Sequence, residues 1–437
     1  MARGATSPRP CWLILGFCLC SALFCIRANA LDPTRQISQY GHTAWRIQDG
    51  VFGGAPHAIT QTADGYLWVG TESGLLRFDG VRFVPWTPPE GKSLPSSAIY
   101  SLLGASDGSL WIGTRTGLSR WKDGDLVIYQ DGRGRINSIV EDRMGAVWIA
   151  RSRVQDANGP LCQVVGTNLH CYGKADGISS PYAGPLVEDS LGNLWIGGDA
   201  LCRWKSGSSG TYLQKELKQF EGPNGVEGLA AAEDGSLWVG ISRAGKALGL
   251  RQFVNGVSKS YVVPGMDGSS LAVDALFLDR SNALWVGTVG QGIYRDYSGR
   301  ADHFRGADGL SSDSIYGFYQ DREGNLWVVT SKGIDCFRDL RVASFSVRES
   351  LTADYVGSVL ADHNGTVWID DGSGIDPGIL EKGGRDDHWG LPGMRERASK
   401  IGGHLEFCSR PRGGTEVQLT IPAKTAYRSS AAKSKSA

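Results

Sequence analysis

The apolar residues of this chain fall into short runs of four or five, each preceded by a turn-forming pair and followed by a small residue. The clearest example is "ADGYLWVGTESGLLRFDG" at 63–80, which recurs as "SDGSLWIGTRTGLSRWKDG" at 106–124. Asp-Gly and similar pairs favour tight turns, and a five-residue apolar run has the length of a strand, not of a helix. The pattern therefore predicts many short β-strands joined by tight turns.

The motif occurs eight times, with further copies at 143–150, 190–198, 233–240, 280–295, 322–339 and 363–369. Its central tryptophans are Trp68, Trp111, Trp148, Trp195, Trp238, Trp285, Trp327 and Trp368. Their spacing of 37 to 47 residues leaves room for four short strands per repeat, which is typical of a β-propeller. Both faces of "LWV" are apolar, as expected for a sheet packed between two neighbouring sheets, so each Trp is expected to wedge between adjacent blades. The Gly after the strand allows a close backbone approach. Seven copies are complete and the eighth is partial, so the ring has seven blades, with the last strand helping to close it, or eight.

Charge and acidic residues add little candidate chemistry. The chain has 45 basic and 45 acidic residues, which argues against a broad basic surface for nucleic acid. Most acids fall in turns, such as Asp64, Asp107 and Asp234, where turn geometry accounts for them. The segment 321–325, Asp-Arg-Glu-Gly-Asn, lacks the bidentate Glu and the oxygen count of a Ca²⁺ loop. A propeller enzyme needs an acid and a base converging on one face, and the sequence does not single out such a pair.

The N-terminus has the features of a secretory signal peptide. Arg3 and Arg9 precede the apolar run at 11–26, and small residues at 28–30 suit cleavage. We expect residues 1–30 to be removed and the mature chain, from Leu31, to be exported to the periplasm; an uncleaved membrane anchor is the alternative. The stretch "LCQVVGTNLHC" predicts a hairpin in which Cys162 and Cys171 either pair or remain two buried thiols.

The composition changes after Ile369. Residues 370–422 contain two glycine-rich loops, a helix candidate in "GMRERASKI" and a closing hairpin from "HLEFCSR" and "TEVQLTIP", which together predict a small α+β piece. Residues 423–437 are small, polar and basic, and we expect them to be disordered. The sequence thus divides into a signal peptide (1–30), a β-propeller (31–369), the α+β piece (370–422) and a tail (423–437).

The repeated "DGxLWxGTxxGLxRxDG", with the opening "HTAWRIQDGVFGGAPHAITQTADGYLW", resembles the two-component regulator propeller family over about residues 40–369. The resemblance implies the periplasmic sensor half of a bacterial histidine kinase. Family members usually carry two such rings, an immunoglobulin-like domain, a membrane helix and a kinase core. This chain has one ring's worth of repeats and neither an immunoglobulin-like domain nor a membrane helix after it.

The order "DDGSG…HWGLPGMRERA…GGTEVQLTIP" resembles the end of a histidine-kinase ATPase domain. The resemblance implies that Asp370 binds adenine, that Gly372 and Gly374 form the first loop, that Gly390 and Gly393 form the lid loop, and that Thr415 lies near the base. Only the last third of such a domain is covered. The helix with the Mg²⁺-coordinating Asn and the phosphoacceptor helix are missing, so we expect neither tight ATP binding nor kinase activity. A propeller in the periplasm and an ATP site in the cytoplasm are also incompatible within one chain when no membrane span separates them. We interpret the join near residue 369 as a fusion of two ends of a larger sensor kinase.

Two functions therefore remain open. The first is a ligand-sensing propeller of a two-component system, whose response regulator is a partner only if an intact kinase exists. The second is an exported carbohydrate- or protein-binding propeller without kinase activity. Either ligand, for instance an oligo- or polysaccharide, is expected on a propeller face near the central channel or the loops. The aromatic residues Trp86, Tyr100, Tyr182 and Tyr316 are candidates there, although the sequence does not define the pocket. A homodimer is compatible with the sequence.

Overall fold

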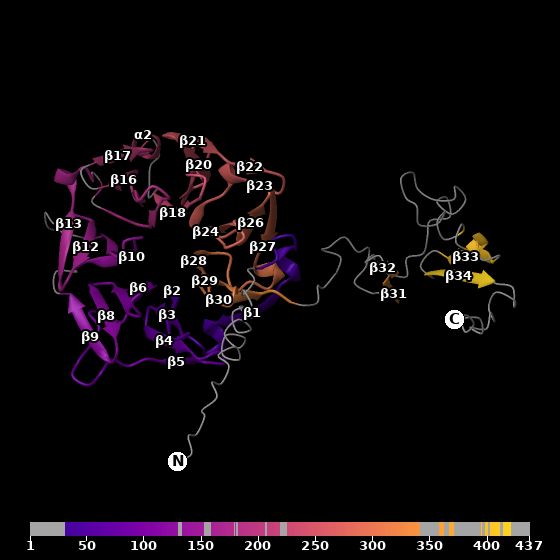
Figure 1. Ribbon diagram of the computed structural model, residues 1–437, viewed down its shortest axis with the longest axis horizontal. Helices are drawn as coiled ribbons and strands as arrows, with labels where there is room; N and C mark the ends of the chain where they lie inside the picture. The colour runs from indigo at the N-terminus through magenta and orange to yellow at the C-terminus, as the bar shows by residue number, and fades with distance from the viewer. Residues whose placement is uncertain are drawn as a thin grey trace, which may run out of the picture. The chain divides into compact units, whose positions relative to one another are not determined.

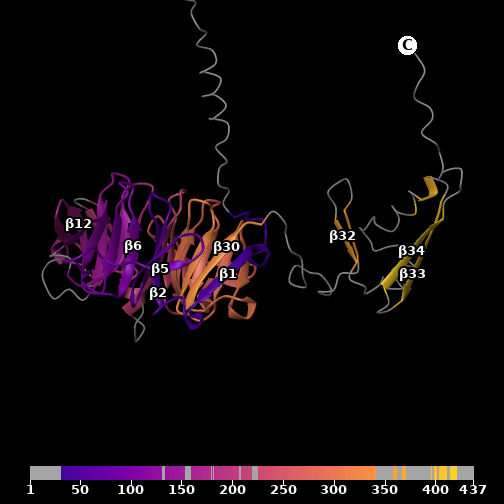
Figure 2. The ribbon, with the colours of Figure 1, turned by 90° about the horizontal axis from the view of Figure 1, so that it is seen from below.

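The computed structural model describes residues 31–129, 133–152, 159–178, 180, 182–205, 208–218, 225–340, 358–361, 367–370, 395, 398–400, 403–410 and 414–420. The chain divides into two units, residues 1–341 and 342–437. The first unit is a ring of seven four-stranded antiparallel sheets, shown face-on in Figure 1 and edge-on in Figure 2. The predicted β-propeller is confirmed, and it has seven blades.

The blades follow one another along the chain. Within each blade the strands lie side by side, with one strand nearest the centre of the ring and the fourth at its rim (Figure 1). Blade 1 consists of β2 (Pro56–Gln61), β3 (Leu67–Thr71), β4 (Gly74–Phe78) and β5 (Phe83–Pro85). Blade 2 consists of β6 (Ile99–Gly104), β7 (Leu110–Thr114), β8 (Leu118–Lys122) and β9 (Asp125–Tyr129). Blade 3 consists of β10 (Arg135–Glu141), β11 (Val147–Ser152), β12 (Leu161–Val165) and β13 (Asn168–Tyr172). Blade 4 consists of β14 (Leu186–Glu188), β15 (Leu194–Ile196), β16 (Leu201–Lys205) and β17 (Ser208–Tyr212).

Blade 5 consists of β18 (Val226–Ala231), β19 (Leu237–Ile241), β20 (Leu250–Val254) and β21 (Val257–Ser260). Blade 6 consists of β24 (Val273–Leu278), β25 (Leu284–Thr288), β26 (Ile293–Tyr297) and β27 (Arg300–Phe304). Blade 7 consists of β28 (Ile315–Gln320), β29 (Leu326–Thr330), β30 (Gly333–Arg338) and β1 (Gly41–Arg46). Short elements between strands are the helix α2 (Gln214–Lys218), a hairpin of β22 (Val262–Val263) and β23 (Met266–Asp267), and single 3₁₀ turns at Ile37–Gln39, Ile47–Asp49, Lys174–Asp176, Gly268–Ser270 and Gly306–Asp308.

The first strand of the chain closes the ring, and this differs from the sequence-based expectation that the last strand does so. Strand β1 pairs with β30 along its whole length, from Gly41 opposite Arg338 to Arg46 opposite Gly333. His42 Nε2 lies 2.8 Å from Oδ1 of Asp335, whose carboxylate is fully buried. The closure therefore joins the two ends of the propeller by a strand ladder and a buried polar contact.

The eighth motif lies outside this ring. Trp368 belongs to β32 (Val367–Asp370), which pairs with β31 (Ser358–Ala361) in a separate two-stranded sheet of the second unit. The second unit also contains the predicted hairpin, formed by β33 (His404–Arg410) and β34 (Gly414–Thr420). We expected the propeller to extend to residue 369, whereas the division of the chain lies after residue 341. The signal peptide and the tail at 423–437 fall outside the described residues.

The tryptophans of the repeat pack between neighbouring blades, as the sequence predicts. Trp285 of blade 6 is fully buried against Ile315 and Val328 of blade 7, and Trp327 of blade 7 packs against Val69 of blade 1. In five blades the indole Nε1 donates to a side chain six residues earlier. The acceptors are Thr62, Asp142, Asp189, Asp279 and Asp321. Each hydrogen bond fixes the tryptophan to the turn that leads into its own strand.

The glycine after each apolar run allows adjacent blades to approach closely. A Cβ on Gly287 would lie 2.6 Å from Cγ2 of Ile315, the first residue of the next inner strand. A Cβ on Gly113 would lie 2.8 Å from Cγ2 of Ile136 in the same way. Contacts below 3 Å do not occur for real side chains, so a larger residue here would push the inner strands apart.

Cys162 and Cys171 form a disulfide across the β12–β13 hairpin, where they are direct cross-strand partners. Of the two alternatives for these cysteines, the structure therefore shows pairing. Among the described residues, no helix has the length and apolar character needed to cross a membrane.

Candidate functional site

The inner strand of six blades begins with a β-bulge, and one side chain at each bulge reaches the central channel. The register shifts between Pro56 and Ala58 in β2, and the same shift occurs at the start of the other five inner strands. The residues at the shifts are His57, Tyr100, Asn137, Glu227, Asp274 and Tyr316. A bulge re-aims a side chain that the regular pleat would point elsewhere, and bulges often occur beside functional sites.

Blade 4 has a glycine at the equivalent place. The β14–β15 register places Leu186 opposite Ile196, as Ile59 lies opposite Val69 in blade 1, so Gly184 corresponds to His57. A Cβ on Gly184 would lie 3.0 Å from the Tyr182 hydroxyl oxygen and 3.5 Å from Oε2 of Glu227. The missing side chain therefore leaves room for Tyr182 to reach blade 5.

These residues line one cavity of about 500 Å³ at the mouth of the channel, which also contacts Arg135, Ser138, Tyr182 and Pro185. All seven blades contribute to it. Its volume lies in the range of small-molecule sites, and its lining combines aromatic, charged and amide side chains. We call the seven residues from successive blades the channel ring: His57, Tyr100, Asn137, Gly184, Glu227, Asp274 and Tyr316.

One side of the channel ring is a column of stacked aromatic rings. The His57 ring centroid lies 4.7 Å from that of Tyr100 and 5.2 Å from that of Tyr316. The Arg135 guanidinium lies over the Tyr100 ring, 4.0 Å from its centroid. Burial lowers the pKa of His57, and the charge of Arg135 acts in the same direction, while Glu72 opposes them. Nε2 of His57 is buried and has no hydrogen-bond partner among the described residues; it lies 3.6 Å from Oε1 of Glu72.

The other side of the channel ring is acidic. The Tyr182 hydroxyl lies 3.2 Å from Oε1 and 3.0 Å from Oε2 of Glu227 and donates to this carboxylate. Burial raises the pKa of Glu227 to about 7; the Tyr182 hydrogen bond opposes this rise, and the negative charge of Asp274 adds to it. Burial also raises the pKa of Asp274, to about 6. The two carboxylates therefore titrate near neutral pH.

Asn137 separates the aromatic side from the acidic side. Its Nδ2 donates to the Ala183 carbonyl at 2.6 Å, which orients the amide, whereas its Oδ1 is buried and has no partner within the described part of the chain. A buried acceptor without a partner costs roughly 1–3 kcal/mol, so a donor supplied by a ligand would be favourable here.

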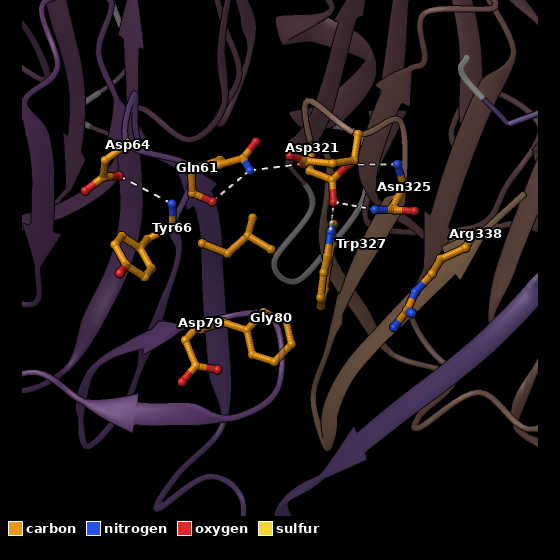
Figure 3. A pocket seen from close by; sticks show the side chains of 13 residues that line it. Gln61, Asp64, Tyr66, Asp79, Gly80, Asp321, Asn325, Trp327 and Arg338 are labelled. Atoms are coloured by element: carbon orange, nitrogen blue, oxygen red, sulfur yellow. Dashed lines mark hydrogen bonds between the residues drawn. The ribbon is translucent and has the colours of Figure 1, made fainter. Parts of the chain in front are cut away.

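A second cavity, of about 390 Å³, lies between blades 1 and 7 at the opposite ends of the inner strands (Figure 3). Several of its polar groups already bind one another. Asp321 accepts hydrogen bonds from the Asn325 amide and the Trp327 indole, both at 2.8 Å, and Gln61 Nε2 lies 3.1 Å from Oε2 of Glu323. Arg322 donates to backbone carbonyls of blade 1. This cavity belongs to the packed junction between blades 1 and 7, and the Asp321 turn has a structural role there.

The structure tests the aromatic candidates named from sequence. Tyr100, Tyr182 and Tyr316 all line the channel cavity. Trp86 does not; it packs against Trp68 and Trp121 between blades 1 and 2. The acids assigned to turns also behave as expected, since Asp64, Asp107 and Asp234 accept backbone hydrogen bonds two residues ahead.

Of the six residues proposed to bind nucleotide, the structure describes the backbone of two, Asp370 and Thr415. The backbone of Asp370 ends β32 and that of Thr415 lies in β34, two strands of different sheets. Gly372, Gly374, Gly390 and Gly393 lie outside the described residues. Their assignment to ATP stays a prediction.

Sequence reasoning missed His57, Asn137, Glu227 and Asp274, although a signal for them exists. Each channel-ring residue lies eleven positions before the central tryptophan of its repeat, from His57 before Trp68 to Tyr316 before Trp327. This position holds a different residue type in most blades, unlike the packing positions around it. A search for what the repeats share therefore passes over it.

Two segments of the chain, 93–116 and 309–332, match the family model described as "Two component regulator propeller". No curated protein matches the chain at a significant level.

Solved structures match the fold. The extracellular domain of a hybrid two-component system from B. thetaiotaomicron is 20% identical with a TM-score of 0.60, covering 77% of this chain and 47% of that one. A second such domain from the same organism is 17% identical with a TM-score of 0.55, and the match covers 78% of this chain and 45% of that one. Virginiamycin B lyase from Staphylococcus aureus is 16% identical with a TM-score of 0.53, and the match covers 69% of this chain and 100% of that one. This chain thus spans less than half the length of the two extracellular domains. At these identities the likeness establishes a propeller, and the family-model match shows that two of its repeat segments are similar to those of regulator propellers.

Proposed function

We propose that this chain is the ligand-sensing propeller of a two-component signalling system, and that its ligand binds in the cavity of the channel ring. The observation that carries this proposal is the convergence of side chains from all seven blades on one cavity of about 500 Å³. The repeat match to regulator propellers and the extracellular sensor domains of the same fold support the signalling context. The ligand chemistry fits a small polar molecule with a ring, such as a sugar unit of an oligo- or polysaccharide.

The ligand site is testable with Tyr316→Ala, which removes one end of the aromatic column. Tyr316 is 41% exposed, so its truncation should leave the fold intact. Thermal stability of the wild-type chain and the variant would be compared across a panel of sugars and small metabolites. At least one compound should raise the unfolding temperature of the wild type and not of Tyr316→Ala. Tyr297→Ala, in β26, is the matched control because Tyr297 does not line the cavity. If every compound that stabilises the wild type also stabilises Tyr316→Ala, the binding site lies elsewhere.

Export is part of the same proposal. Residues 1–30 would act as a cleaved signal peptide, and the Cys162–Cys171 disulfide supports an oxidising compartment. Mass spectrometry of the protein recovered from the periplasm should find a mature chain that begins at Leu31. A chain that retains residues 1–30 and sediments with membranes would instead favour an uncleaved anchor.

We further propose that the segment after Ile369 does not support ATP-dependent phosphorylation in this chain. The resemblance covers only the last third of an ATPase domain and does not include the metal-binding and phosphoacceptor helices on which phosphoryl transfer in such kinases depends. A response regulator would then be a partner only of an intact kinase. ATP binding at micromolar strength that disappears in Asp370→Ala would overturn this part of the proposal.

A further inference from the structure

Among the described residues, neither carboxylate on the acidic side of the channel ring forms an ion pair with a basic side chain. Glu227 accepts only the hydroxyl of Tyr182, and Asp274 makes neither a hydrogen bond nor an ion pair within the part of the chain that the structure describes. Both side chains line the cavity. Desolvated carboxylates are normally paired with a cation, because burying a negative charge alone is costly.

The charges around the cavity correct this imbalance only in part. Asp199 lies close enough to raise the pKa of Glu227, and Glu72 to raise that of Tyr316. Arg135 is the basic residue among the cavity-lining side chains; its guanidinium lies over the Tyr100 ring, and its charge acts on Glu227 by lowering the pKa of that carboxyl, without forming an ion pair with it. Burial lowers the pKa of His57, which favours the neutral imidazole. The mouth of the channel therefore has an excess of negative charge.

The rest of the lining suits a hydroxyl-bearing ring. Oδ1 of Asn137 is an acceptor without a partner among the described residues, and Ser138 follows it in the lining. Tyr316 follows Asp274 around the channel ring, and its ring has His57 stacked on one side. A cation next to Asp274 would thus also lie next to the aromatic ring of Tyr316, where cation–π attraction adds to the ion pair.

We propose, building on the ligand site proposed above, that the ligand is an amino sugar with a free amine, whose ammonium group binds between Glu227 and Asp274. The sugar hydroxyls would reach the amide of Asn137 and the hydroxyl of Ser138. The absence of a side chain at Gly184 keeps Tyr182 in contact with Glu227, so the hydroxyl of Tyr182 positions that carboxylate for the ammonium.

Binding of this kind releases protons. Burial raises the pKa values of Glu227 and Asp274 to about 7 and about 6, so both carry protons for part of the time at pH 6. An adjacent ammonium favours the ionised carboxylates, and it must displace those protons. Affinity should therefore rise between pH 5.5 and 7, a range in which the amine remains charged. His57, Glu72, Asp199 and Arg135 are the other charged or titratable groups that act on this region.

The test compares D-glucosamine with D-glucose, which share a ring and differ in one ammonium group. Isothermal titration calorimetry with the full chain at pH 7 should show glucosamine binding at least about tenfold more tightly, as expected for charge-assisted hydrogen bonds. Its affinity should increase from pH 5.5 to 7. The double variant Glu227→Gln, Asp274→Asn should lose the preference while keeping its circular dichroism spectrum. Glu233→Gln, an exposed residue in the turn after β18, is the matched control and should behave as wild type.

The outcomes separate the two proposals. Equal affinity for the two sugars, with both lost in Tyr316→Ala, would overturn the ammonium inference and leave the channel site intact. No glucosamine binding at tens of millimolar, or a preference that persists in the double variant, would also overturn the inference. The proposed sensor site itself would fail only if no compound of the panel depended on Tyr316.

Discussion

Replacing Glu227 by Gln should stabilise the protein at alkaline pH, which is unusual for a residue that accepts a buried hydrogen bond. Burial raises the pKa of Glu227 from an ordinary value of 4.5 to about 7 in the folded chain. Between these two pH values the folded state binds more protons than the unfolded state, so stability falls as the pH rises. Below about pH 4.5 the carboxyl is neutral in both states and no cost arises. Above pH 7 the full cost is present.

The magnitude follows from the shift. At about 1.4 kcal/mol per pKa unit, a shift of roughly 2.5 units corresponds to about 3 kcal/mol at pH 8. Gln keeps the size of the side chain and an oxygen that accepts from the Tyr182 hydroxyl, but it carries no charge. The hydrogen bond weakens by about 1 kcal/mol because its acceptor is no longer ionised. A net gain of about 2 kcal/mol at pH 8 should therefore shrink to about zero near pH 4.5.

Thermal unfolding of wild type and Glu227→Gln at pH 5 and pH 8 measures this difference. The variant should unfold a few degrees higher than wild type at pH 8 and within about a degree of it at pH 5. Glu233→Gln is the control, since Glu233 is exposed in a turn of the same blade and should show no such change. A Glu227→Gln variant that is less stable than wild type at both pH values would refute the argument that this carboxylate is desolvated.

Three further predictions concern the ring itself. Asp335→Ala should lower the free energy of unfolding by about 3–5 kcal/mol, because it leaves buried donors from β1 and blade 7 unpaired. The control is Asp339→Ala, which removes an exposed carboxylate. Equal unfolding temperatures of the two variants would contradict the role of the His42–Asp335 contact in closure. Gly184→Ala should displace the Tyr182 hydroxyl and weaken the preference for glucosamine over glucose several-fold, as measured by calorimetry. An unchanged affinity for glucosamine would show that the Tyr182 hydroxyl is not needed to position Glu227. Removing the Cys162–Cys171 disulfide by two Ser substitutions should cost about 2–3 kcal/mol for its short loop, and a reducing agent should then have no further effect on the unfolding temperature.

Much of the architecture is encoded locally and could be predicted. The period of the motif determines four strands per blade, and the Gly after each apolar run reflects the approach of the next inner strand, as at Gly287 and Ile315. The β12–β13 hairpin follows from a short turn between two alternating runs. These features depend on residues within one repeat or between adjacent repeats, where the sequence pattern is strongest.

Closure of the ring depends instead on contacts between residues nearly three hundred positions apart. The segment 41–46 reads as an ordinary strand, and nothing in its own pattern identifies β30 as its partner. The buried contact between His42 and Asp335 becomes visible only when the two ends meet. The eighth tryptophan, Trp368, continues the period of the motif, although it lies in a separate hairpin. Periodicity alone therefore could not decide which strand closes the ring.

The channel ring was missed apart from Tyr100 and Tyr316, and for a different reason. Its residues occupy one position of the repeat but differ in chemistry, with His57 and Tyr100 in the first two blades and Glu227 and Asp274 in the fifth and sixth. Packing requires the same residue types in every blade, whereas a binding site requires a different residue from each. We therefore expect ligand contacts at the variable positions of a propeller repeat, where each inner strand begins.

The central claim is that the channel ring binds the ligand, and a crystal structure of the full chain grown with D-glucosamine tests it most directly. We predict density for the sugar at the channel mouth, with its amine within hydrogen-bonding distance of Glu227 and Asp274. Density for the sugar on another surface, with the channel ring occupied by water alone, would contradict the account.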